Sequence, residues 1–85
     1  MQAVTIYTTS TCPYCDRAKQ LLNQKNIPFK EIDVTDSSDR EAMMERANGR
    51  KTVPQIFIGE HHVGGFDDLN ALKAEELNAL LQGGS

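Results

Sequence analysis

The two cysteines of this 85-residue chain lie close together, in the stretch TSTCPYC. Cys12 and Cys15 are separated by Pro13 and Tyr14, a C-x-x-C spacing that suits a redox pair, half of a metal site or a short disulfide. A disulfide that closes so short a loop removes only about 2 kcal/mol of unfolded-chain entropy. Small domains that depend on disulfides usually carry several of them, in oxidising compartments. A purely structural role therefore explains this pair poorly.

A zinc site requires further ligands, because structural zinc is bound by four side chains. The two histidines, His61 and His62, are neighbours in a predicted strand, where successive side chains point to opposite faces. One chain therefore completes such a site only with difficulty, so we expect no metal and assign the histidines no role. A half site shared with a second chain stays open as an alternative.

The position of Cys12 favours a reactive thiol. It follows a predicted strand and precedes a predicted helix, whose first N–H groups are unpaired and whose dipole has its positive end there. Lowering a cysteine pKa from about 8.5 to about 5 in this way corresponds to roughly 5 kcal/mol of differential stabilisation of the thiolate. Cys15, one turn further along, is close enough to attack a disulfide formed on Cys12. We therefore expect Cys12 to be the nucleophile and Cys15 the resolving cysteine.

The elements around this motif alternate between strand and helix. Residues 3–8 and 29–35 alternate apolar and polar side chains as strands do, whereas residues 13–25 have apolar side chains at helical spacing. Strand, helix and strand in succession predict a right-handed parallel crossover. The cysteines are then expected where the first strand meets the first helix.

The chain after this unit predicts a second helix and a hairpin. Ser38 and Glu41 have the spacing of a capping box, and the helix that they begin is expected to end at Gly49. Residues 54–65 are typical of two short strands, joined by a two-residue type II′ turn that begins with Gly59. This half of the chain therefore adds a helix and two antiparallel strands.

A leucine-lined helical segment closes the chain. Gly64 and Gly65 end the last strand, Asp67 or Asp68 can cap the helix, and an interruption near Ala74 can divide it. The predicted order is βαβαββα, an α/β fold.

Composition limits the classes of function. The chain is 39% hydrophobic and 25% charged, and its net charge of −3 argues against nucleic-acid binding and against anionic membrane surfaces. It has no basic leader and no run of about 18 apolar residues, so we expect a cytoplasmic protein. Residues 1–82 are expected to form one domain, monomeric for lack of any contrary signal, and residues 83–85 a flexible tail.

Three motifs together resemble the glutaredoxin family: CPYC at 12–15, TVPQIFI at 52–58 and GGFDDL at 64–69. The resemblance runs from about Val4 to Leu81 and is strongest to the small bacterial dithiol members. Three motifs in the right order and at the right separations are far more specific than one C-x-x-C pair. The resemblance implies a thioredoxin-like fold, with a four-stranded mixed sheet flanked by helices, and glutathione as the co-substrate that reduces the protein.

The resemblance also implies a glutathione site built from the two later motifs. A cis bond before Pro54 is expected to turn the Val53 backbone outward, where it pairs with the cysteine segment of glutathione as a short added strand. Backbone N–H groups of Phe66 and Asp67 bind the γ-glutamyl carboxylate, and the Asp67 carboxylate binds the ammonium. Gly65 lets the ligand approach the backbone closely. The predicted glutathione-binding residues are Tyr14, Thr52, Val53, Pro54, Gly65, Phe66 and Asp67.

One position departs from the family pattern. Many relatives carry a lysine where this chain has Thr9, and that lysine helps to hold the thiolate and the glycine carboxylate of glutathione. Thr9 carries no charge, so Arg50 and Lys51 are the candidates to replace it, unless they are simply solvated surface charges.

The expected function is therefore a glutathione-dependent thiol–disulfide oxidoreductase. Its expected partners are glutathione and proteins that bear disulfides or glutathionyl groups. One alternative is a two-chain carrier of a glutathione-ligated iron–sulfur cluster, which Pro13 after the first cysteine disfavours. The other is a thioredoxin-like reductant served by a flavoenzyme, which Tyr14 and the short chain disfavour.

Overall fold

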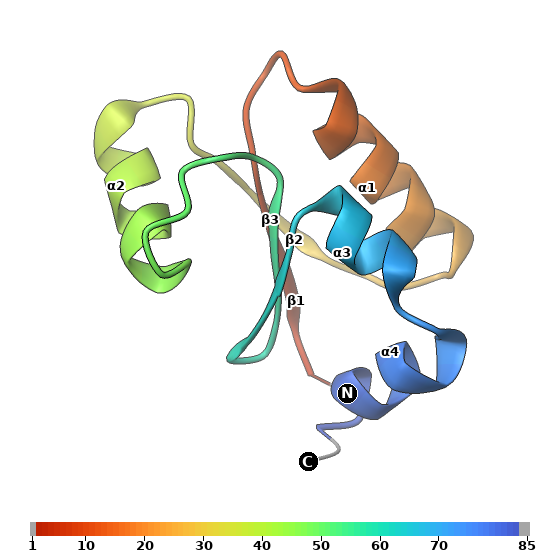
Figure 1. Ribbon diagram of the computed structural model, residues 1–85. Helices are drawn as coiled ribbons and strands as arrows, with labels where there is room; N and C mark the ends of the chain where they lie inside the picture. Colours follow the sequence, from red (N-terminus) through yellow and green to blue (C-terminus); the bar gives the residue numbers. More distant parts are fainter. Residues whose placement is uncertain (1, 84–85) are drawn as a thin grey trace.

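The computed structural model describes residues 2–83, which contain one four-stranded sheet (Figure 1). The elements in chain order are β1 (Val4–Thr8), α1 (Pro13–Gln24), β2 (Lys30–Asp33), α2 (Ser37–Arg46), β3 (Gln55–Ile58), β4 (His61–Gly64), α3 (Phe66–Ala71) and α4 (Ala74–Leu81). The strand order is β2-β1-β3-β4, with β1 and β2 parallel and the other neighbours antiparallel. The mixed sheet is confirmed, and the closing helical segment is divided in two just before Ala74.

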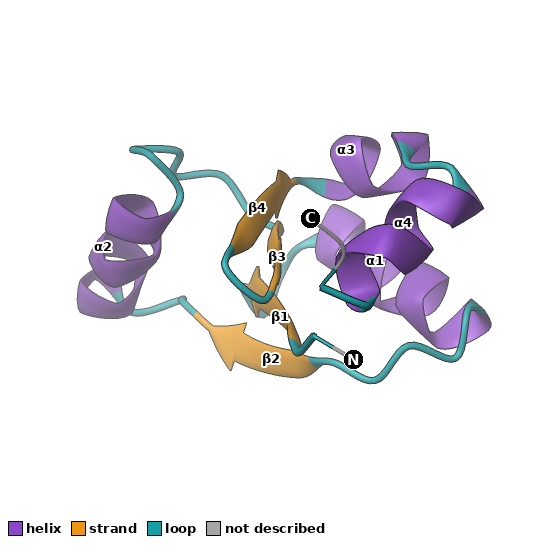
Figure 2. Ribbon diagram, turned by 90° about the horizontal axis from the view of Figure 1, so that it is seen from below, coloured by secondary structure: helices purple, strands orange, loops and turns teal. Residues whose placement is uncertain are grey.

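Helices cover both faces of the sheet, with α2 on one face and α1, α3 and α4 together on the other (Figure 1, Figure 2). Neighbouring residues of a strand point to opposite faces, so Ile6 faces the three helices and Tyr7 faces α2. The larger core cluster comprises Val4, Ile6, Ala18, Leu22, Ile27, Ile56, Ile58, Leu69, Leu77 and Leu81. The smaller cluster comprises Tyr7, Val34, Met43, Ala47 and Phe57. Because both faces are covered, all four residues of β3 are buried.

The start of α2 differs from the expectation. Asp36 is the N-cap residue, and its carboxylate accepts hydrogen bonds from the Ser38 N–H at 3.0 Å and the Ser38 hydroxyl at 2.9 Å. The prediction that Ser38 and Glu41 form a capping box is therefore wrong. The helix instead begins earlier, which adds a hydrogen bond from the Arg40 N–H to the Asp36 carbonyl at 3.1 Å.

The end of α2 also differs, because the helix ends at Arg46 and not at Gly49. Asn48, with φ at +57°, takes the left-handed position, and the Gly49 N–H then donates to the Met44 carbonyl at 2.8 Å. Asn26 takes the same conformation after α1, with φ at +58°. Asparagine tolerates it because its short polar side chain bonds locally.

The β3–β4 hairpin brings the last motif back to the first. Its turn lies at Gly59 and Glu60, as predicted, and of these two only Gly59 has a positive φ, +59°, the pattern of a type II′ turn. The chain therefore returns to the end of the sheet where β3 began, and α3 starts beside the loop that precedes β3 and packs against α1 (Figure 1).

Two sequence expectations concern the C-terminal tail and membrane-spanning helices. Of the tail expected at 83–85, only Gly83 belongs to the described residues. Within residues 2–83, every helix is too short or too polar to span a lipid bilayer.

Candidate active site

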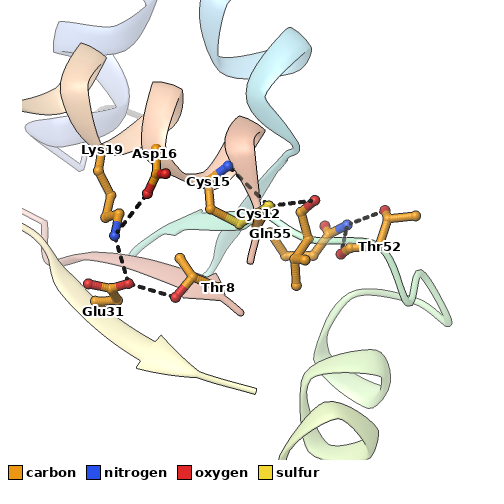
Figure 3. Close-up of a disulfide and its surroundings, with 9 residues drawn as sticks. Thr8, Cys12, Cys15, Asp16, Lys19, Glu31, Thr52 and Gln55 are labelled. Atoms are coloured by element: carbon orange, nitrogen blue, oxygen red, sulfur yellow. Dashed lines mark hydrogen bonds and ion pairs between the residues drawn. A yellow bond between two sulfur atoms is a disulfide. The ribbon is translucent and has the colours of Figure 1, made fainter. Parts of the chain in front are cut away.

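The two cysteines lie where β1 passes into α1, as the sequence predicts. Cys12 is the N-cap residue of α1 and Pro13 is the first helical residue. The cysteines form a disulfide, and the Sγ atom of Cys12 accepts a hydrogen bond from the Cys15 N–H at 3.1 Å (Figure 3). The sulfur thus takes the place of an N-cap oxygen. A thiolate at this position gains both this hydrogen bond and the positive end of the helix dipole.

The two sulfurs differ in burial. Cys12 is half-buried, whereas Cys15 is only 1% exposed. Exposure and thiolate character together decide which cysteine reacts with a solvent-borne substrate. Such a substrate therefore reaches Cys12 first, while Cys15 is within reach only of a partner already attached to Cys12.

A groove of about 180 Å³ lies beside Cys12 and brings together three segments far apart in the sequence. Its lining residues are Tyr14, Arg50, Thr52, Val53, Pro54, Gly65, Phe66, Asp67 and Asp68. All seven residues predicted to bind glutathione are among them. Of the other two, Arg50 was expected only as a substitute charge and Asp68 only as a helix cap.

One side of the groove, which we call the loop wall, consists of Thr52, Val53 and Pro54. The Val53–Pro54 peptide bond is cis, as expected. The Val53 carbonyl oxygen lies 3.7 Å from the Sγ atom of Cys12 (Figure 3). Thr52 is exposed and Pro54 is buried, so the loop wall passes from the surface into the core within three residues. A ligand in the groove therefore meets the Val53 backbone and the Cys12 sulfur together.

The other side, which we call the helix wall, runs from Gly65 to Asp68. Gly65 is the N-cap residue of α3, and its N–H donates to the Asp68 carboxylate at 2.9 Å. The expectation that Asp67 or Asp68 is the N-cap residue is therefore wrong, because both lie inside the helix; Asp68, the third helical residue, bonds back to the N-cap N–H. The Nη1 atom of Arg50 lies 3.6 Å from the same carboxylate. Phe66 and Asp67 form the first turn, where N–H groups have no acceptor within the helix.

Two adjacent glycines serve the helix wall in different ways. Gly64 has φ at +118°, and a Cβ atom there would overlap the Asp68 carboxylate, so the backbone requires glycine. Gly65 has an ordinary φ of −93°, and a Cβ atom there would make only normal contacts, 3.5 Å from the Pro54 carbonyl oxygen and 3.9 Å from Arg50. The fold does not require glycine at 65, but a side chain there would stand between the two walls.

Tyr14 lies at the rim of the groove, as expected, with 53% of its surface exposed. Its ring centroid is 6.2 Å from that of Phe66, and the Arg17 guanidinium lies 5.3 Å from the Tyr14 centroid. The cation and the neighbouring ring limit the movement of this exposed side chain. Tyr14 thus extends the helix wall toward the cysteines.

The structure distinguishes the two candidates for the missing positive charge. Arg50 lines the groove and faces Asp68, whereas Lys51, its neighbour, is exposed and lies outside the lining. Thr9 is half-buried and also lies outside the lining. The sequence placed Arg50 and Lys51 on equal terms, because which of two neighbours faces the groove depends on the path of the loop before Thr52.

A polar cluster next to the cysteines had no sequence signal. The hydroxyl of buried Thr8 donates to the Glu31 carboxylate at 2.7 Å, and Lys19 donates to the same oxygen at 3.0 Å (Figure 3). The Asp16 carboxylate lies 3.6 Å from the Nζ atom of Lys19. The bond from Thr8, followed by that from Lys19, holds the pKa of Glu31 below its ordinary value. The bond to Glu31 raises the pKa of Lys19. This cluster ties α1 to β1 and β2 one turn after Cys15.

Known proteins match this chain over most of its length. The family model described as Glutaredoxin matches residues 4–63. The chain belongs to the glutaredoxin family. A glutaredoxin of Pseudomonas aeruginosa is 55% identical over 82 residues, which cover 95% of this chain and 98% of the relative. Glutaredoxin 3 of Escherichia coli is 50% identical over 74 residues, which cover 87% of this chain and 89% of the relative.

Solved glutaredoxin structures have the same fold. The solution structure of a glutaredoxin from Brucella melitensis has a TM-score of 0.83 and 53% identity, covering 100% of this chain and 94% of its own. A buckwheat glutaredoxin–glutathione complex has a TM-score of 0.80 and 28% identity, covering 96% and 78%. A glutaredoxin with a C-x-x-C pair is a thiol–disulfide oxidoreductase, and this activity follows for the present chain.

Proposed function

We propose that this glutaredoxin depends on glutathione and reduces both protein disulfides and glutathionyl mixed disulfides. The observation that carries the proposal is the groove beside Cys12, in which residues from three separate motifs meet. The buckwheat relative, which forms a complex with glutathione, supports the same ligand.

Glutathione lies along both walls in this proposal. The Val53 N–H and C=O pair with its cysteine segment as an added strand. The N–H groups of Phe66 and Asp67 receive the γ-glutamyl carboxylate, and the Asp67 carboxylate receives the ammonium. Arg50 supplies the positive charge that attracts the glycine carboxylate and that Thr9 lacks. The remaining contacts come from Tyr14, Thr52, Pro54 and Gly65.

For a glutathionyl mixed disulfide, the Cys12 thiolate attacks the glutathione sulfur. The S–S bond between Cys12 and glutathione forms as the substrate thiolate leaves and takes a proton from water. A second glutathione thiolate then attacks the bound glutathione sulfur, releasing glutathione disulfide and restoring the Cys12 thiolate. Cys15 takes no part in this cycle.

For a protein disulfide, Cys12 attacks one substrate sulfur and the other leaves as a thiolate. Cys15 then attacks the Cys12 sulfur, which forms the Cys12–Cys15 disulfide and releases the second substrate thiol. Two glutathione molecules reduce this disulfide to two thiols and become glutathione disulfide. The burial of Cys15 beside Cys12 suits an attack from within the protein.

Single-cysteine variants test these roles. In an assay that follows release of glutathione from a glutathionylated peptide, Cys12→Ser should abolish turnover and Cys15→Ser should retain it. With a protein disulfide as substrate, both variants should fail to complete the reaction. Equal losses in the first assay would contradict the assignment. The reductant separates the proposal from a thioredoxin-like protein. The Cys12–Cys15 disulfide should be reduced by glutathione together with glutathione reductase, and not by thioredoxin reductase.

We also propose that the protein works in the cytoplasm, where glutathione keeps thiols reduced. The monomeric state and the single domain at 1–82 stay predictions. Size-exclusion chromatography with light scattering tests the first, and limited proteolysis tests the second.

A further inference from the structure

A buried glutamine connects the loop wall to a histidine of β4. Gln55 has an exposed fraction of 0%. Its Nε2 atom donates to the Thr52 carbonyl at 3.0 Å and lies 3.1 Å from the Thr52 hydroxyl oxygen (Figure 3). Its Oε1 atom lies 2.6 Å from the Nε2 atom of His62. Both ends of the side-chain amide are therefore paired, one of them with the backbone of the groove.

The direction of these hydrogen bonds follows from one acceptor. The Thr52 carbonyl can only accept, so Gln55 must turn its NH₂ group toward Thr52 and its oxygen toward His62. His62 must then carry a hydrogen on Nε2 and donate it. The His62 ring stacks on Phe57 with centroids 4.7 Å apart and an interplanar angle of 18°, which holds this nitrogen toward Gln55.

The same bonds orient the backbone that faces the groove. The Thr52–Val53 peptide bond is trans, and in a trans peptide the C=O and the N–H point in opposite directions. A bond that holds the Thr52 carbonyl toward buried Gln55 therefore turns the Val53 N–H away from the core. Val53 lines the groove, so its N–H is directed to the ligand side.

We propose that Gln55 and His62 are positioning residues for glutathione, with His62 acting through Gln55 to fix the orientation of the Thr52–Val53 peptide. The inference rests on the proposed function, because it assigns the Val53 N–H to the backbone of glutathione. Neither side chain belongs to the lining of the groove. They act by holding the Val53 N–H in place. A donor that is already held loses less conformational freedom when the ligand binds, so the ligand binds more tightly.

Two substitutions remove the connection while keeping the shape of the site. Gln55→Met is close in size and removes both hydrogen bonds, and His62→Phe keeps the stacked ring and removes the Nε2 donor. Thr52 is exposed and His62 is half-buried, so water can replace the partners that these two residues lose in Gln55→Met. His62→Phe leaves the buried Gln55 oxygen without its donor, so a urea titration of each variant checks that it folds. His61→Phe is the matched control, because His61 is adjacent, exposed and outside the groove.

Kinetics with a glutathionylated peptide give the first result. Gln55→Met should raise KM about five- to tenfold and His62→Phe about threefold, the range for a misplaced hydrogen bond. The kcat value and the rate of Cys12 alkylation by iodoacetamide should stay within about twofold of the unsubstituted protein, because the thiolate keeps its own donors. His61→Phe should leave KM unchanged. An unchanged KM in Gln55→Met would overturn the inference.

The double variant tests whether His62 acts through Gln55. If it does, Gln55→Met with His62→Phe has the KM of Gln55→Met alone, because the first substitution has already broken the connection. If the two substitutions instead raise KM by factors that multiply in the double variant, His62 acts independently of Gln55, and its proposed positioning role is overturned. If either residue has a merely structural role, its substitution should lower the free energy of unfolding without producing this pattern in KM.

Spectra of the reduced protein without glutathione separate the inference from the proposed function. The ¹H–¹⁵N signal of Val53 should shift or split in Gln55→Met and His62→Phe, and stay unchanged in His61→Phe. An unchanged Val53 signal in the first two variants refutes the positioning role even if the unsubstituted protein turns over the peptide. Failure of the unsubstituted protein to turn over the peptide refutes the proposed function, and the glutathione part of the inference with it.

Discussion

The two walls of the groove rest on different interactions. The loop wall is anchored in the core, by buried Pro54 and by the neutral hydrogen bonds of Gln55. The helix wall is held at the surface by the ion pair between Arg50 and Asp68, whose side chains are 47% and 51% exposed. Hydrogen bonds between neutral groups are not weakened by salt, whereas exposed ion pairs are screened by it.

This difference suits the two ends of the proposed ligand. In the proposed function, the Val53 backbone of the loop wall pairs with any extended peptide and so accepts protein substrates as well as glutathione. The helix wall presents Asp67 and free N–H groups to a carboxylate and an ammonium, which together mark the γ-glutamyl end. Under this proposal the loop wall positions the ligand, and the helix wall discriminates glutathione from other thiols.

The largest expected effect comes from Gly64→Ala, which disrupts the backbone that supports the helix wall. Alanine is strained at φ +118°, and its Cβ atom would displace the Asp68 carboxylate from the Gly65 N–H. We expect the free energy of unfolding to fall by about 2 to 3 kcal/mol, measured by urea titration.

Gly65→Ala is the matched variant for that experiment. Because a Cβ atom at Gly65 makes only normal contacts, the free energy of unfolding should change by less than about 0.5 kcal/mol. The KM for a glutathionylated peptide should rise, because the methyl group stands between the walls. A loss of stability equal to that of Gly64→Ala would show that both glycines serve the backbone.

The second prediction separates the walls by their response to salt. Asp67→Asn should raise KM for a glutathionylated peptide about tenfold at low ionic strength. This difference should shrink in 1 M salt, where the Debye length falls to about 3 Å from about 10 Å at 0.1 M. The effect of Gln55→Met should be the same at both salt concentrations. Equal salt dependence in the two variants would contradict the distinction between the walls.

A smaller effect is expected from the positive charge at the groove. Arg50→Gln should raise KM for glutathione about threefold, because an exposed cation contributes less than about 1 kcal/mol. Lys51→Gln is the control and should leave KM unchanged, since Lys51 lies outside the lining. If the two variants respond alike, the charge acts at long range and Arg50 has no specific place in the site.

The smallest effect concerns pH. Burial, followed by the Arg50 charge, lowers the pKa of His62 below its ordinary value of 6.5, with Asp68 opposing the shift and His61 and Arg46 adding to it. Below about pH 6.5 the unfolded chain therefore binds a proton that the folded protein does not, so stability falls as pH falls. Urea titrations between about pH 7.5 and 5.5 should show this slope in the unsubstituted protein. The slope should disappear in His62→Phe and persist in His61→Phe.

Local pattern was sufficient for the elements and for the reactive pair. The strand at Val4–Thr8 and the helix at Pro13–Gln24 lie within a residue or so of the predicted ranges. Periods of two and 3.6 residues are properties of a short stretch of chain, and so is the position of Cys12 ahead of a helix. The hairpin turn at Gly59 was also predictable, because its geometry depends on a positive φ that glycine readily supplies.

The cap of α2 shows where local pattern fails. Asp36, Ser37 and Ser38 are all good N-cap residues, and the sequence alone does not rank their positions. The choice of Asp36 depends on where the chain leaves β2 and can turn toward the sheet. In the structure the Ser38 hydroxyl is a donor to Asp36 and not a cap.

By itself, the sequence determined which residues carry the chemistry: the C-x-x-C pair and the two motifs that line the groove. The tertiary structure alone decided which side chains support them. Gln55 and His62 meet because the hairpin pairs Phe57 with His62, and Thr8 meets Glu31 because β1 lies beside β2. These contacts join residues on different strands, so they depend on strand register and helix packing, which no short stretch of the chain contains.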